Sequence, residues 1–124
     1  MRQALSALLI AHGVAHLVGF VVPWKLLASP ETPYRTTILA GAIDVGDAGV
    51  RALGLLWLTA AVGFVFLGGA LLAGLNARAW LLAMPLVSLG LCALGWPDAR
   101  IGVAVNVVLV GVLLLMPQLG TVAP

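Results

Sequence analysis

The segment 4–20 constrains this chain more than any other part of its sequence. It is almost entirely apolar, and its length suits a helix that crosses a lipid bilayer. It also contains both histidines of the chain, His12 and His16, which lie one helical turn apart. Because an ionisable side chain is unfavourable in hydrocarbon, histidines at this place indicate a functional site. The sequence therefore predicts a membrane helix that carries part of a polar site.

The composition of the whole chain predicts an integral membrane protein. Of its 124 residues, 63% are hydrophobic and 8% are charged, whereas a soluble domain carries about 25% charged residues. The apolar stretches are continuous, which is typical of helices and not of barrel strands. From the apolar composition we expect the lipid bilayer as a partner. Because the few cations are dispersed, we expect no nucleic acid. The length predicts one domain over residues 1–124.

The predicted fold class is all-α, a four-helix transmembrane bundle in the cell (cytoplasmic or inner) membrane. One long polar loop, at 24–49, joins the first two helices. Pro23 and Pro117 end the first and last helices, and Pro85 predicts a kink in the third. The apolar run 38–43 within the loop is too short to span, and we interpret it as an interfacial or re-entrant segment. The four spans are predicted at about 4–22, 50–73, 79–95 and 101–116.

Polar residues converge at one end of this predicted bundle. The long loop and the turn 96–100 share one side, opposite the amino terminus and the turn 74–78. At 1.5 Å per residue, His16 and Asn106 lie about 12 Å deep from the loop side, and His12 lies one turn deeper. The candidate catalytic residues are His12, His16, Asp47 and Arg51. The candidate ligand-binding residues are Asp44, Trp57, Trp96, Asp98, Arg100 and Asn106.

Each of these residues also has a structural interpretation. Asp47 and Asp98 can cap helix amino termini, where a carboxylate accepts hydrogen bonds from free amides. Arg51 can pair with Asp47 across one turn, and Asn106 can hydrogen-bond between helices. The two histidines can hydrogen-bond to the backbone, although two imidazoles at this depth are an unfavourable means of joining helices.

The spacing of the histidines permits several kinds of chemistry. Histidines four residues apart share a helical face and can share a metal ion, with Asp44, Asp47 or Asp98 completing the site. Haem would take only one of them as an axial ligand, because they cannot reach opposite faces of one haem. A neutral imidazole beside Arg51 or Asp47 can move a proton. The cofactor stays open, and an enzyme would be an acid–base isomerase or hydrolase, or would use a metal, on a lipophilic substrate.

The layout resembles the DoxX-like group of small bacterial four-helix membrane proteins. The resemblance is carried by His-Gly-Val-Ala-His-Leu at 12–17 and Gly-Leu-Leu-Trp-Leu at 54–58. It implies the fold more than an activity, since the functions of that group are mostly unassigned. The acidic residue that the group often has early in its second span is replaced here by Arg51 and Trp57. By analogy alone, the chain is also similar to sterol-isomerase-type (EXPERA) bundles, through His16, Asn106, Trp96 and Asp47.

Two functions of different classes are consistent with these patterns. The first is a site inside the bundle for a small lipophilic ligand, whose polar head contacts both histidines, with Arg51, Asp47 and Asn106 around them. The second is a structural or accessory subunit of a larger membrane complex, or a permease-like transporter component. In that case small-residue faces, such as the stripe of alanine and glycine within 7–19, contact a partner or a second copy.

Overall fold

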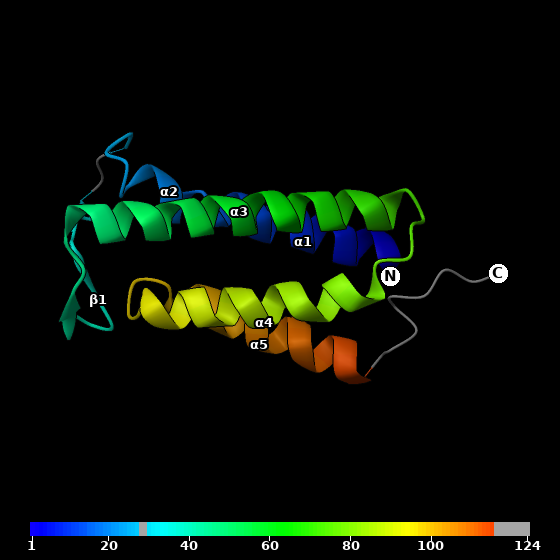
Figure 1. Ribbon diagram of the computed structural model, residues 1–124. Coiled ribbons are helices and arrows are strands. Elements are labelled where there is room, and N and C mark those ends of the chain that lie inside the picture. Colours follow the sequence, from blue (N-terminus) through cyan, green and yellow to red (C-terminus); the bar gives the residue numbers. More distant parts are fainter. Residues whose placement is uncertain (28–29, 116–124) are drawn as a thin grey trace.

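The computed structural model describes residues 1–27 and 30–115. In this part of the chain the fold is all-α with four helices, as the sequence predicts, two long and apolar and two shorter. The first helix is interrupted at Leu17, and its two pieces are α1 and α2 (Figure 1). The helices are α1 (Arg2–His16), α2 (Val18–Val21), α3 (Gly46–Leu72), α4 (Arg78–Leu94) and α5 (Arg100–Leu115).

The helix boundaries follow from local sequence chemistry. α3 begins four residues before the predicted span, where the carboxylate of Asp44 accepts a hydrogen bond from the amide of Gly46 at 2.9 Å. It ends at Leu72, and two residues later Gly74 has a φ of 74°, the left-handed conformation that glycine adopts freely. The amide of Leu75 then donates to the carbonyl of Ala70 and closes the helix. The predicted end of the last helix, at residues 116 and 117, lies outside the described residues.

The loop between the first two helices contains a short β-hairpin. β1 (Thr37–Ile38) pairs antiparallel with β2 (Ile43–Asp44). The segment 38–43 is therefore a hairpin that lies at the end of the bundle and not a re-entrant segment (Figure 1). β-branched side chains favour the extended strands, and Gly41, with a φ of 87°, lies in the turn between them.

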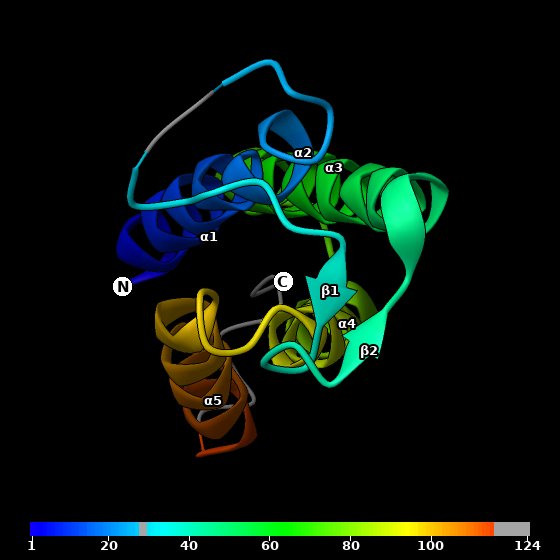
Figure 2. The ribbon, with the colours of Figure 1, turned by 90° about the vertical axis from the view of Figure 1, so that its left-hand side faces the viewer.

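The helices form two layers, which are visible end-on in Figure 2. α1 and α2 pack along α3 in one layer, and α4 packs along α5 in the other. The amino terminus, the α3–α4 turn and the end of α5 lie at one end, called here the amino-terminal end. The long loop and the α4–α5 turn lie at the opposite end, called here the loop end. This is the topology that four consecutive helices predict.

The two halves of the bundle interior differ in their contents. A core of buried apolar side chains fills the amino-terminal half, with Leu9, Phe64 and Leu109 almost fully buried. Toward the loop end, this apolar packing gives way to buried polar side chains. The candidate functional site therefore lies between the layers, on the loop side of the core.

Candidate functional site

Four polar side chains from three helices meet between the two layers. They are His12 and His16 of α1, Ser88 of α4 and Asn106 of α5, and we call them the buried polar cluster. Their exposed fractions are 7%, 3%, 0% and 0%. Polar groups buried to this degree are unfavourable unless they are hydrogen-bonded. Their hydrogen-bond partners therefore determine what the cluster can do.

Asn106 fixes the orientation of the cluster. Its amide nitrogen Nδ2 donates to the backbone carbonyl of Gly102 at 2.9 Å and to the hydroxyl of Ser88 at 2.8 Å. Because a carbonyl oxygen only accepts, Nδ2 has to face Gly102, and the oxygen Oδ1 has to face His12. That oxygen lies 3.2 Å from Nε2 of His12. His12 therefore carries its proton on Nε2 and donates it to Asn106.

The proton positions on His16 follow in the same way. Its Nδ1 lies 2.9 Å from the backbone carbonyl of His12, so Nδ1 carries a proton and donates. Its Nε2 lies 2.6 Å from Oγ of Ser88. Ser88 accepts from Asn106 and is free to donate its own proton to His16. The cluster is thus satisfied with both imidazoles neutral and in opposite tautomers.

Aromatic side chains hold the two imidazoles in place. The ring centroids of His12 and His16 lie 4.4 Å apart, with the planes at 76°. Phe64 of α3 lies edge-on to His12 at 4.8 Å, and Trp57 of α3 lies 5.1 Å from His16. Among the described residues, every fully buried side-chain nitrogen or oxygen has a hydrogen-bond partner. The rings are therefore oriented before any ligand arrives.

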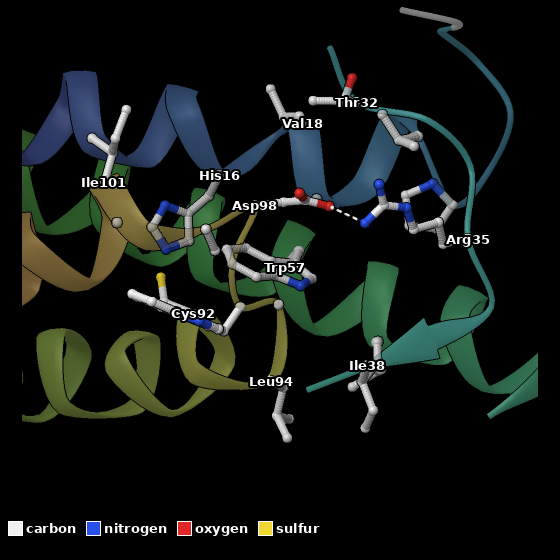
Figure 3. Close-up of a pocket in the computed structure, with 18 of the residues that line it drawn as sticks. His16, Val18, Thr32, Arg35, Ile38, Trp57, Cys92, Leu94, Asp98 and Ile101 are labelled. Atoms are coloured by element: carbon white, nitrogen blue, oxygen red, sulfur yellow. Dashed lines mark ion pairs between the residues drawn. The ribbon is translucent and has the colours of Figure 1, made fainter. Parts of the chain in front are cut away.

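A cavity of about 550 Å³ extends from these imidazoles to the loop end. Its inner end is bordered by His12, His16 and Cys92, and its wall is largely apolar. Figure 3 shows His16 and Cys92 at one end, Trp57 along the wall, and Arg35 and Asp98 toward the other. The cavity therefore has an apolar middle with polar groups at both ends.

The loop crosses the outer end of the cavity and joins the two layers. Nη1 of Arg35 pairs with Oδ2 of Asp98 at 3.5 Å, and both side chains are about half exposed. The amides of Leu39 and Ala40 donate to the carbonyls of Leu94 and Trp96, at 2.9 and 2.8 Å. These contacts attach the loop to the end of α4 and to the turn that follows it.

Tyr34 attaches the same loop to the other layer. Its hydroxyl donates a hydrogen bond to Asp47 in the first turn of α3. This hydrogen bond raises the pKa of Tyr34 above its usual value. Lys25 lies over the Tyr34 ring, 4.4 Å from the centroid. With contacts to both layers, the loop crosses the mouth of the cavity.

The predicted site residues fall into two groups in the structure. Five of them border the cavity: His12, His16, Trp57, Trp96 and Asp98. Asn106 belongs to the buried polar cluster behind the histidines and does not border the cavity. Asp44, Asp47, Arg51 and Arg100 do not border it either, so the acids and arginines predicted beside the histidines are not brought to them.

These outlying residues have local roles at the loop end. Asp44 accepts a hydrogen bond from the amide of Gly46, which lowers the pKa of its carboxyl group. Asp47 accepts a hydrogen bond from the hydroxyl of Tyr34. Within the described part of the chain, no ion pair joins Asp47 to Arg51. The Arg51 carbonyl accepts the indole N–H of Trp24 at 3.2 Å. Arg100 is the first residue of α5.

Sequence reasoning missed three side chains at the site, Ser88, Cys92 and Arg35. Ser88 and Cys92 lie four residues apart within the third predicted span, the same spacing as the two histidines. That spacing was the available signal, since it places a hydroxyl and a thiol on one helical face. Arg35 carries no comparable signal, because the path of a long loop does not follow from its composition.

The arrangement has definite chemical possibilities. A serine hydroxyl that donates to an imidazole is the pairing used to activate a nucleophile. Ser88, however, is fully buried and does not border the cavity, so a molecule in the cavity meets the imidazoles and Cys92 first. Among the described residues, no three histidine, cysteine or acidic side chains come together as metal ligands. A binding role therefore has more structural support than catalysis by Ser88.

The chain was also compared with known proteins. No protein-family model, no curated protein and no solved structure matches it. The function is therefore inferred from the geometry and chemistry of the site, since a fold alone does not define an activity.

Proposed function

We propose that this chain is a transmembrane four-helix bundle of the cell membrane, of DoxX-like type, that binds a small lipophilic molecule between its two layers. The observation that carries the proposal is the cavity of about 550 Å³ that ends on two oriented, neutral imidazoles. Ligand pockets commonly enclose about 300–1,000 Å³ and combine an apolar wall with a few fixed polar groups. The cavity has this size and this character.

The outer surface of the helices supports a membrane location. Two helices, Arg2–Val21 and Gly46–Leu72, are long and apolar enough to span a bilayer. α4 and α5, with 17 and 16 residues, lie near the lower limit of about 17–25 residues for a span. Large apolar side chains outside the cavity remain more than half exposed, among them Val62, Phe66, Leu86 and Val108. In water such a surface would favour aggregation, whereas lipid covers it.

The tryptophans support the same location. Trp24 and Trp96 lie at the loop end, and Trp80 lies in the first turn of α4 at the amino-terminal end. Their exposed fractions are 39%, 49% and 66%. Tryptophan is enriched at both membrane–water interfaces, where its ring is half solvated. Exposed indoles at both ends therefore match a bundle that spans a bilayer.

Extraction of membranes with alkaline carbonate, which removes peripheral proteins only, tests the proposed membrane location. The protein should stay with the membrane pellet.

The binding proposal can be tested through the single cysteine of the chain. Cys92 is 1% exposed and borders the inner end of the cavity. In nanodiscs, 1-dodecanol should slow the reaction of Cys92 with methyl methanethiosulfonate several-fold, because an occupied cavity keeps the reagent from the thiol. A reaction rate that is unaffected at every dodecanol concentration would contradict the proposal.

A matched control uses a thiol on the outer surface. Val108 of α5 is 59% exposed and does not border the cavity. In the double variant Cys92→Ala/Val108→Cys, the introduced thiol should react at the same rate with and without dodecanol. Equal slowing at both positions would mean that dodecanol acts on the bilayer or on the reagent and not on the cavity.

The alternative function, an accessory subunit, is favoured by a different observation. Gly69, Gly90 and Gly111 have open space on the side where a Cβ would project. Small residues on a lipid-facing surface let a partner helix or a second copy approach closely. If such a partner exists, Gly90→Leu should separate it from the protein in native mass spectrometry and should leave the protection of Cys92 by dodecanol unchanged.

A further inference from the structure

We infer that the inner end of the cavity binds the hydroxyl group of a neutral lipophilic alcohol, which donates its hydrogen bond to Nδ1 of His12. This inference rests on the proposed ligand-binding function and names the class of ligand. It follows from the direction of the hydrogen bonds in the buried polar cluster. It also depends on which polar atoms are left for a ligand once those bonds are made.

The tautomer of His12 is fixed from outside the cavity. The carbonyl of Gly102 orients the amide of Asn106, and that amide presents its oxygen to Nε2 of His12 at 3.2 Å. The ring proton is therefore on Nε2, and Nδ1 carries a lone pair and no proton. His12 can accept one further hydrogen bond and cannot donate another.

That lone pair is accessible from the cavity. The side-chain hydrogen bond found for His12 is made by Nε2, and none is found for Nδ1. Since every fully buried side-chain nitrogen or oxygen of the described residues has a partner, Nδ1 is not fully buried. His12 is nonetheless only 7% exposed, and the open space that it borders is the cavity. Nδ1 thus reaches this space.

At the inner end the protein offers a ligand the acceptor Nδ1 and no strong hydrogen-bond donor. Both ring nitrogens of His16 are occupied, by the His12 carbonyl and by Ser88. Ser88 and Asn106 do not border the cavity. The thiol of Cys92 is the other polar group there; its sulfur accepts from Nδ2 of Asn106 at 3.6 Å, and its S–H is only a weak donor. The inner end therefore selects a ligand that donates.

The apolar wall narrows the class of donor further. An ammonium or guanidinium group would have to leave water for a cavity without a carboxylate at its inner end, which is strongly unfavourable. Ketones, esters and ethers have no proton to donate, and they leave Nδ1 unpaired. A neutral hydroxyl group on an apolar body brings no charge into the cavity and has a proton to donate to Nδ1.

The experiment compares two probes that differ in this proton. In nanodiscs, 1-dodecanol and dodecyl methyl ether are titrated at matched mole fractions in the bilayer, and protection of Cys92 from methyl methanethiosulfonate is measured. Dodecanol should protect at about tenfold lower mole fraction, the order expected for one neutral hydrogen bond in an apolar site. Equal protection by both probes would overturn the inference and leave the proposed function standing. Protection by neither would overturn both.

The variant His12→Gln shows whether Nδ1 is the atom responsible. The amide nitrogen of glutamine takes the place of Nε2 and can still donate to Asn106, while its carbonyl oxygen then points to the side opposite the former position of Nδ1. In this variant the preference for dodecanol should fall to about onefold, with protection by the ether unchanged. A preference retained by a folded His12→Gln protein would overturn the assignment to His12. If the variant does not fold, the comparison of the two probes on the unaltered protein still decides the inference.

Discussion

The two interfaces of this bundle are built in different ways. Between α1 and α3, glycines bring the helices into contact: a Cβ on Gly13 would lie 2.8 Å from the carbonyl oxygen of Ala61. Between the two layers, by contrast, His12 and His16 meet Ser88 and Asn106 through hydrogen bonds. The interface between α1 and α3 is defined by shape and leaves no room for a cavity. The second is defined by directional bonds, and the cavity lies beside it.

This difference explains how a cavity persists in a small bundle. A close-packed interface is stable only when it is filled, because each void forfeits dispersion contacts. A satisfied hydrogen-bond network fixes the distance between helices without filling the space next to it. The buried polar cluster and the loop therefore hold the layers apart at two places, and the cavity lies between them.

The largest expected effect comes from removing the centre of the buried polar cluster. Asn106→Leu keeps a similar side-chain volume but leaves the Nε2 proton of His12 without an acceptor and removes the donor to the Ser88 hydroxyl. At about 1 kcal/mol or more for each buried group left unsatisfied, the free energy of unfolding should fall by about 3 kcal/mol. Reversible unfolding in mixed detergent micelles measures this change.

Val107→Ala serves as the control for that measurement, because Val107 is the next residue of α5 and is 55% exposed. It should change the free energy of unfolding only slightly. If Asn106→Leu is no more destabilising than Val107→Ala, the cluster does not hold the layers together, and the contrast between the two interfaces fails.

The next effect tests the close-packed interface with two neighbouring glycines of α3. A Cβ on Gly68 would lie 2.8 Å from the backbone carbonyl of Ser6, whereas a Cβ on Gly69 meets nothing within 4 Å. Gly68→Ala should therefore destabilise the protein by about 2 kcal/mol through overpacking. Gly69→Ala should stabilise it by up to about 1 kcal/mol, because alanine favours the helix. Equal effects in the unfolding assay would refute the shape-defined contact.

A smaller effect is expected at Ser88, which links the two halves of the cluster. Ser88→Ala removes the proton donated to His16 but leaves Asn106 bonded to His12 and to Gly102. A hydrogen bond between membrane helices contributes about 0.6 to 2 kcal/mol, so we expect a loss of about 1 kcal/mol. When Ser88→Ala is combined with Asn106→Leu, the loss of unfolding free energy should be smaller than the sum of the two single losses. Both changes break the hydrogen bond between Asn106 and Ser88. Additive losses would show that Ser88 and Asn106 act independently.

The sequence predicts the four helices and their order, because long apolar stretches separated by turns leave few alternatives. Counting along the helices also predicts that Asn106 approaches the histidines. The predicted depth is less accurate: the count places Asn106 level with His16, yet its side-chain oxygen contacts His12. The position of Ser88 is not among the predictions; its spacing of four residues from Cys92 marks one face of the helix, but a helix so apolar elsewhere gives no further indication of which face turns inward. The role of Asp47 depends on where Tyr34 lies, and hence on the path of the loop.

The smallest expected effect on stability is at the mouth, where the polar contacts are exposed. Arg35 and Asp98 are about half exposed, and an ion pair in such a position contributes little to folding. Arg35→Ala should therefore leave the unfolding transition nearly unchanged. It should nevertheless make Cys92 react a few times faster with methyl methanethiosulfonate, because one of the contacts that hold the loop over the cavity is lost. High salt should reproduce this acceleration in the unaltered protein and add little in the variant, since salt screens exposed charges.

Arg78→Ala, at the start of α4 and the opposite end of the bundle, provides the control. Equal reaction rates in all three proteins would mean that molecules enter the cavity between the helices from the bilayer, and that the loop is a fixed wall and not an entrance.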